Sequence, residues 1–302
     1  MGLEAIHVVR WALYTDLGFL FGAPLFASLL TKSPSMPVNA RALGALAVLG
    51  LALSGAGFAL TVAAMSGTPV ASIDTDVLKF VLTSTSVGWA FLGRMSALLA
   101  MLVILAAPGS VQPFRLMLIT LLAAIAVGSL AWSGHAAASQ GISSLVRLTS
   151  DIVHMLAASA WLGALVILLR QVLMTKPWEV EHRRQTALIL SRFSFAGSVI
   201  VITLIVTGSL NAAFIFKPSG LLLLPSTTYG QLLLIKLIAF GVMLGLAALN
   251  RFYLTPALSN SVKAGDATTA IFAVRTSIGL ELALATSVLA LVAWLGTLDP
   301  NA

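Results

Sequence analysis

Eight long apolar stretches constrain this chain more than any other feature of its sequence. Each is about 20 residues or longer, the length that an α-helix needs to cross about 30 Å of hydrocarbon. The second stretch carries Ser54, Gly55 and Gly57, small residues that suit close helix packing. Prolines and glycines separate the stretches, which run over residues 7–30, 42–66, 87–106, 114–133, 150–173, 192–216, 230–254 and 273–297. The sequence therefore predicts an all-α fold, a polytopic membrane protein built as an eight-transmembrane-helix bundle.

Composition argues against a soluble globule. Only 9% of the 302 residues are charged and 59% are hydrophobic, whereas a soluble domain carries about 25% charged residues. The longest connections, 67–86 and 174–191, are too short for a soluble domain, so we expect one integral membrane domain over residues 1–302. The chain has no cysteine, which excludes disulfides, thiolate metal sites and haem attached through a cysteine pair. It also has no nucleotide-binding loop, which excludes a pumping ATPase.

The basic residues predict an orientation, because cytoplasmic loops carry an excess of lysine and arginine. If the N-terminus lies outside, four basic residues fall in outer loops or helix ends: Arg10, Lys79, Arg147 and Lys217. Eleven fall on the inner side: Lys32, Arg41, Arg115, Arg170, Lys176, Arg183, Arg184, Arg192, Arg251, Lys263 and Arg275. We therefore predict both termini outside. The net charge of +7 reflects this topology, and no nucleic acid is expected as a partner because no aromatic platform accompanies the basic residues.

The polar residues inside the spans gather in the outer half of the membrane. A charge at mid-bilayer costs about 3 kcal/mol on insertion scales, so such residues face the bundle interior or mark a pathway. Asp16 and Glu281 lie near or below the midplane, and Asn250 ends a stripe of α-helical heptad positions that also holds Lys236. The outer group comprises His7, Met65, Arg94, Met95, His135, Asp151, His154, Met155, Asn211 and Lys236.

Asp151 and His154 are three residues apart, on one face of their helix. Both can ligate a metal, or the carboxylate can orient a ligating imidazole through a hydrogen bond. Alternatively Ser150 or Asp151 caps the helix N-terminus. Arg94 and Lys236 are expected to neutralise Asp16 and Asp151 and to hold the helices together, because protonated guanidinium and ammonium groups cannot bind a metal ion. The methionines are either ligands or packing residues.

At these residues the chain resembles the copper resistance protein D family (CopD, also PcoD) over nearly its whole length. The first span, from Arg10 to Phe26, looks like the family's opening helix. The C-terminal half, residues 192–297, carries the most distinctive likeness. In the central pair of spans, the matching pieces are Gly134-His135-Ala136 and Asp151 to His154 with Trp161 to Gly163. In the C-terminal half, they are Arg192 to Ser194, Thr207-Gly208, Asn211, Tyr229-Gly230, Leu234 to Lys236, and Asn250-Arg251 with Pro256.

The resemblance implies a bacterial inner-membrane protein of copper homeostasis and resistance, not an enzyme. With the orientation predicted from the basic residues, both termini are then periplasmic. The resemblance also implies that the protein accepts copper at the periplasmic face, beside a periplasmic copper carrier of the CopC type, and moves it across the lipid bilayer. Without cysteine, Cu(I) needs methionine and histidine, and Cu(II) needs histidine with carboxylate or amide oxygens. We therefore predict a copper site, Cu(I) or Cu(II), with His135 and His154 at its core.

The remaining assignments around this site stay open at the level of the sequence. Asp151 is a ligand or orients one, and a further ligand comes from His7, Met155, Met95 or Met65. Asp16 and Glu281 are candidates to carry an ion or proton lower in the path, with Arg94, Asn211, Lys236 and Asn250 as pathway or structural polar groups. Two other functions remain possible: a membrane copper chaperone or assembly factor without transport, and a haem- or chromophore-binding membrane redox protein.

Overall fold

The structure is a computed structural model, and it confirms an all-α membrane protein. Eight of its helices are long and apolar enough to cross a bilayer. No strand occurs in the described part of the chain. The described residues are 2–30, 39–109, 112–133, 142–175, 179–215, 225–264 and 267–298.

The helices follow the predicted apolar stretches but extend beyond several of them. The predicted span 150–173 belongs to a helix that begins at Ile142, and the predicted span 192–216 belongs to one that begins at Val180. The elements are α1 (Gly2–Leu30), α2 (Ala40–Ser66), the 3₁₀ turn η1 (Val70–Ser72), α3 (Thr75–Ser84), α4 (Ser86–Ala106), α5 (Pro113–Gly128), the 3₁₀ turn η2 (Ser129–Ser133), α6 (Ile142–Met174), α7 (Val180–Ile215), α8 (Thr228–Leu249), the π-helical segment η5 (Asn250–Leu254), α9 (Thr255–Ala264) and α10 (Thr268–Leu295).

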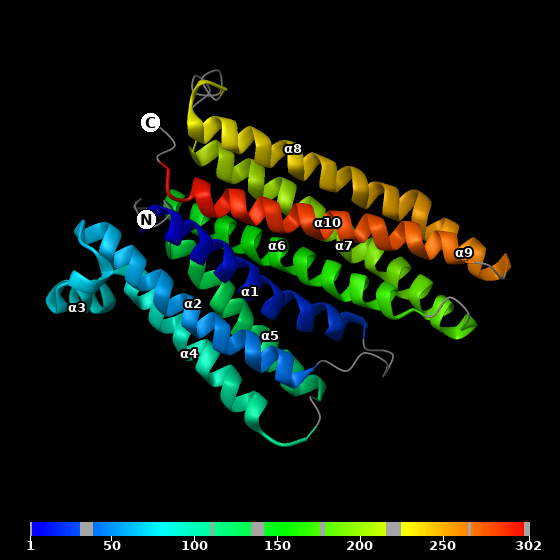
Figure 1. Ribbon diagram of the computed structural model, residues 1–302, viewed down its shortest axis with the longest axis horizontal. Helices are drawn as coiled ribbons and strands as arrows, with labels where there is room; N and C mark the ends of the chain where they lie inside the picture. Colours follow the sequence, from blue (N-terminus) through cyan, green and yellow to red (C-terminus); the bar gives the residue numbers. More distant parts are fainter. Residues whose placement is uncertain are drawn as a thin grey trace.

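Helix α1 occupies the middle of the bundle. It packs against α6 and α5, and also against α2 and α10, so it joins the N-terminal helices to the C-terminal ones. Figure 1 shows the start of α1 and the end of α10 at the same end of the bundle as α3. An even number of spans requires this arrangement, and the predicted topology makes this end the outer one.

Helices α1 and α6 approach each other closely at two glycines. A Cβ atom added to Gly163 would collide with the backbone of Gly22, and one added to Gly22 would collide with the carbonyl oxygen of Ser159. Small residues permit such backbone contact between membrane helices. The small residues expected to support close packing on α2 do not all face a neighbouring helix. Ser54 is fully buried, whereas a Cβ atom added to Gly55 would meet open space.

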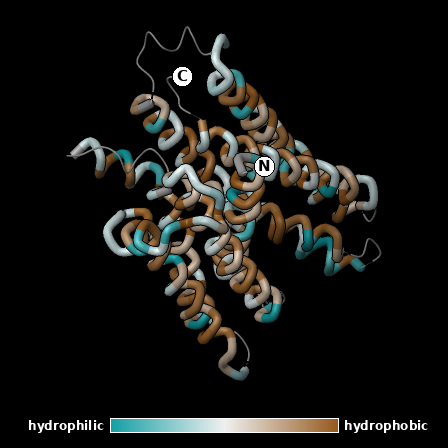
Figure 2. Tube along the Cα trace, turned by 60° about the vertical axis from the view of Figure 1, so that its left-hand side comes forward, coloured by the Kyte–Doolittle hydropathy of each residue, from teal (hydrophilic) through white to brown (hydrophobic). Residues whose placement is uncertain are grey.

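Apolar side chains cover the outside of the bundle as well as its core. Val103 on α4 and Phe195 on α7 are 73% and 77% exposed. Figure 2 shows hydrophobic colour along the lengths of the helices, with hydrophilic residues concentrated toward their ends. In a bilayer these exposed side chains contact lipid, which is the arrangement that the low charge of the sequence predicts.

Candidate functional site

His154 lies on α6 and faces α7. Its Nδ1 is 2.8 Å from the hydroxyl oxygen of Thr207. That hydroxyl also lies 2.6 Å from the carbonyl oxygen of Thr203, to which it can donate its proton while it accepts from His154. In that arrangement Nδ1 carries the imidazole proton, and Nε2 has a lone pair that can bind a metal ion.

Asp151 lies one turn outward from His154 on the same helix. It interacts electrostatically with Arg147 and with Lys236 of α8, and the adjacent Ser150 donates a hydrogen bond to the Thr207 carbonyl oxygen at 3.3 Å. Because α6 begins at Ile142, neither Ser150 nor Asp151 is its N-cap. The capping interpretation is wrong, since the helix continues for two further turns beyond the apolar stretch.

The two cations predicted to neutralise carboxylates behave differently. Lys236 is attracted electrostatically by Asp151, and it repels the protonated form of His154. Arg94 is buried and donates instead to two hydroxyls, those of Ser54 at 3.0 Å and Ser129 at 3.2 Å.

Asp16, the expected partner of Arg94, is 3% exposed. Within the described residues neither of its carboxylate oxygens has a hydrogen-bond partner. The expected pairing of Arg94 with Asp16 is therefore not the arrangement that the structure adopts, because hydroxyl groups on α2 and η2 lie closer to the guanidinium.

His7 is tied to α10 rather than to α6. Its Nε2 is 2.8 Å from the Thr297 hydroxyl, and its ring centroid lies 6.0 Å from that of Trp294. Throughout the described ranges, no group of three histidine, aspartate or glutamate side chains is close enough to hold a metal ion. His7 therefore does not join Asp151 and His154 in this structure, and the remaining predicted ligand, His135, lies outside the described residues.

The candidate methionines have varied surroundings. Met65, at the outer end of α2, is 61% exposed, and Met95 on α4 is half-buried. Met155 packs against the apolar core formed by α1, α2, α4 and α5, whereas its neighbour His154 faces α7. Packing is thus sufficient to account for Met155.

Asn211 extends the His154 site outward along α7. It lies one turn from Thr207 on the same helical face. Its Oδ1 is buried and has no hydrogen-bond partner among the described residues. An amide oxygen in that state is available to a metal ion or a hydrogen-bond donor.

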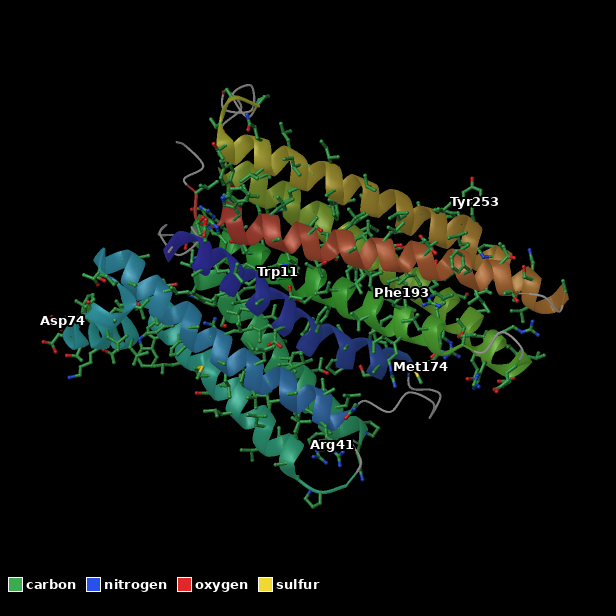
Figure 3. All side chains as sticks on the ribbon, in the orientation of Figure 1. Trp11, Arg41, Asp74, Met174, Phe193 and Tyr253 are labelled. Carbon is green, nitrogen blue, oxygen red and sulfur yellow. The ribbon has the colours of Figure 1, made fainter. Side chains whose placement is uncertain are left out.

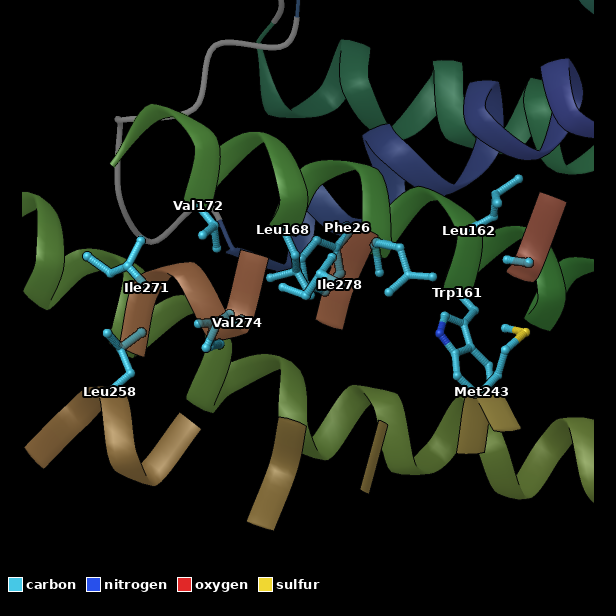
Figure 4. Packing of buried hydrophobic residues seen from close by; sticks show 14 of the residues in the cluster. Phe26, Trp161, Leu162, Leu168, Val172, Met243, Leu258, Ile271, Val274 and Ile278 are labelled. Atoms are coloured by element: carbon cyan, nitrogen blue, oxygen red, sulfur yellow. The ribbon is translucent and has the colours of Figure 1, made fainter. Parts of the chain in front are cut away.

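A second polar pair lies deeper in the membrane. Asn250 donates to Oε1 of Glu281, which is 2% exposed, and Trp161 is a further hydrogen-bond partner of Glu281. Between this pair and the His154 site, Met243 of α8 lies beside Trp161 of α6 (Figure 4). The π-helical segment that begins at Asn250 could not be predicted from the hydrophobic periodicity of the sequence.

Comparison with known proteins decides the family. A model described as Copper resistance protein D-like, N-terminal domain, matches residues 2–145, and one described as Copper resistance protein D matches residues 187–295. The Copper resistance protein D of Pseudomonas syringae pv. tomato is 38% identical over 303 residues, which cover 97% of this chain and 96% of that protein. The chain belongs to the copper resistance protein D family.

Two further relatives match smaller parts of this chain. Inner membrane protein YebZ of Escherichia coli (strain K12) is 33% identical over 57% of this chain and 55% of its own. Copper transport protein CutJ of Bacillus subtilis (strain 168) is 33% identical over 41% of this chain and 22% of its own. No solved structure matches the chain. The family is one of copper resistance and transport proteins rather than enzymes, and membership supports a role in copper resistance for this multi-pass membrane protein.

Proposed function

We propose that this protein accepts copper at the periplasmic face of the inner membrane and moves it across. The observation that carries the proposal is the orientation of His154. When the Thr207 hydroxyl accepts from Nδ1 and donates to the Thr203 carbonyl oxygen, the other ring nitrogen keeps a lone pair for a metal. Metal-binding histidines typically have such a partner on the second nitrogen, which sets both the tautomer and the ring orientation.

The groups around His154 suit Cu(II). Asp151 lies one turn away on α6, and Asn211 presents a buried amide oxygen on α7. Imidazole with carboxylate and amide oxygens is a typical environment for Cu(II), whereas Cu(I) prefers thioether or thiolate sulfur. His135, from the connection between η2 and α6, is the proposed second imidazole, and Lys236 balances the charge of Asp151.

Both termini are proposed to be periplasmic, which puts this site at the periplasmic side, where a carrier of the CopC type would deliver copper. In Figure 3, Asp74 of the predicted outer connection lies at one end of the bundle, and Arg41 and Met174 lie toward the other. The basic inner loops predicted from the sequence belong to the second of these ends.

A copper chaperone or assembly factor without transport is the second candidate function. The apolar packing of Met243 and Trp161 favours it, because both side chains are buried, at 5% and 4% exposed, and lie between the His154 site and the Asn250–Glu281 pair. Transport requires this contact to open. Uptake of radioactive copper into proteoliposomes distinguishes the two: a transporter accumulates copper inside, and a chaperone binds it without accumulation.

The binding site itself is tested by copper titration of purified variants. We expect His154→Ala and His135→Ala each to weaken binding by more than 100-fold, since losing a ligand costs more than losing its hydrogen-bond partner. His182→Ala is the matched control, because that histidine sits near the inner end of α7 and pairs with Glu179 at 3.1 Å. If both site variants fold and bind copper as tightly as the parent protein, the proposed site is wrong.

The haem or chromophore alternative has a simpler test. Among the described residues, His7 bonds to the hydroxyl of Thr297, just after α10, and His154 bonds to the hydroxyl of Thr207 on α7, so the two histidines do not face each other across a shared ligand. We expect purified protein to show no visible absorption band, and a strong band would favour this alternative.

A further inference from the structure

A cavity of about 400 Å³ lies inward of the Met243–Trp161 contact. It is bounded by α6, α7, α8 with η5, and α10, and its volume is within the usual range for small-molecule sites. Most of its wall is aliphatic, with contributions from Leu165, Leu190 and Val201. Such a wall suits a lipophilic ligand better than a hydrated copper ion.

The cavity communicates with the lipid-facing surface through a slot between α7 and α8. In the described residues α8 packs on α10, and α7 packs on α6 and α9, without extensive contact between α7 and α8. Ile202 on α7 and Phe252 on η5 line the cavity and are 62% and 64% exposed. Because both flanking helices lie in the membrane, a ligand can enter sideways from the hydrocarbon.

One end of the cavity is polar, and its lining includes Arg251, whose guanidinium donates to the Ser194 carbonyl oxygen at 3.0 Å. Glu281 and Asn250 also line this end, and Asn250 uses its amide N–H to bind Glu281. The Oδ1 of Asn250 has no hydrogen-bond partner in the described part of the chain. The π-helical turn that begins at Asn250 is a second, independent feature, since such turns recur at functional sites. A carboxylate and a free amide oxygen call for a ligand that donates a proton.

Aromatic side chains flank this polar end. Trp161 of α6 and Phe193 of α7 both line the cavity, and each is held by a neighbour: Phe240 stands 6.2 Å from Trp161, and Phe26 stands 5.1 Å from Phe193 in an edge contact. Rigid aromatic rings stack favourably on a flat ring of a ligand.

We propose that this cavity binds a membrane-soluble hydroquinone. Its phenolic ring lies between Trp161 and Phe193, one hydroxyl donates to Glu281, and the hydrocarbon tail leaves through the slot between α7 and α8. A phospholipid acyl chain would fill the aliphatic part but has no donor for the polar end. The proposal concerns binding alone and does not depend on copper transport.

The test compares two probes on the full-length protein in lipid nanodiscs, without oxygen. Decylhydroquinone has both hydroxyls, and its dimethyl ether keeps the shape and the tail but lacks both donors. Binding in excess of that to empty nanodiscs is measured. We expect the ether to bind at least about tenfold more weakly, since it leaves the buried acceptor atoms of Glu281 and Asn250 without a donor, and an unsatisfied buried acceptor lowers affinity by about that factor.

A pair of variants locates the site. Val201→Phe places a ring in the cavity and should weaken decylhydroquinone binding about tenfold or more. Val199→Phe is the matched control, on the same helix, 49% exposed and outside the cavity wall, and should bind as the parent does. Equal binding of the two probes to the parent protein overturns the proposal in favour of non-specific acyl-chain occupancy, whether or not Val201→Phe folds. Equal binding by the two folded variants also overturns it.

Discussion

Thr207→Val tests whether His154 is oriented for copper binding. The substitution keeps the branched side chain and removes the hydroxyl that accepts from Nδ1 at 2.8 Å. Removing the partner of a ligating histidine typically weakens metal affinity 10–100-fold, which corresponds to about 1.4–2.7 kcal/mol. Hydrogen bonds between membrane helices contribute only about 0.6 kcal/mol to stability on average. Copper binding should therefore fall much more than the stability of the fold.

The assay is a copper competition titration of purified protein, with thermal unfolding measured in parallel. Thr203→Val is the matched control, because its hydroxyl lies one turn away and, among the described residues, bonds only within its own helix, to the Val199 carbonyl oxygen at 2.8 Å. Unchanged copper affinity in a normally folded Thr207→Val protein would refute the reasoning. Equal weakening by both variants would also refute it, because it would assign the effect to α7 as a whole.

Three further predictions follow from the topology and the packing. A periplasm-active reporter should work when fused at the C-terminus and fail in the connection 174–191, and the reverse pattern would move the site to the wrong side. Lys236→Met should chiefly lower the yield of folded protein, because Asp151 loses its cation on α8; a variant that folds normally and loses only metal binding contradicts this structural role. Gly163→Ala should unfold at a markedly lower temperature, because its Cβ would collide with the backbone of Gly22, whereas Gly245→Ala should be nearly neutral because nothing lies within 4 Å of its Cβ position. Equal effects of the two alanine variants would remove the α1–α6 contact as a determinant of stability.

The spans were predictable because the bilayer requires long apolar runs, and hydropathy reports these directly. Hydropathy does not detect the parts of a helix that extend beyond the membrane. The polar first turns of α7, which include Glu181 and Arg184, continue a helix that hydropathy places at residue 192. Hydropathy also misses the amphipathic helix α3, which lies in a connection between two membrane spans.

The candidate site was predictable to the extent that it is local. The spacing of Asp151 and His154 places them on one helical face whatever the fold. The partner of His154 depends on which face of α7 meets α6, which is decided by packing across the bundle and not by either sequence segment alone. The same limit explains Arg94, whose partners Ser54 and Ser129 come from two other elements.

Lys236, Met243 and Asn250 lie seven residues apart along α8 and the start of η5, and this stripe connects these separate observations. Its members meet the neighbouring helices in order of depth: Lys236 interacts with Asp151, Met243 lies beside Trp161, and Asn250 bonds to Glu281. Helices α6 and α8 run in the same direction in the predicted topology, so the proposed transport would take copper inward from His154 along both helices. On that route copper would meet the buried thioether of Met243 and the indole of Trp161 between the two polar pairs. Whether that contact opens is what separates a transporter from a chaperone, because the outer site is the same in both.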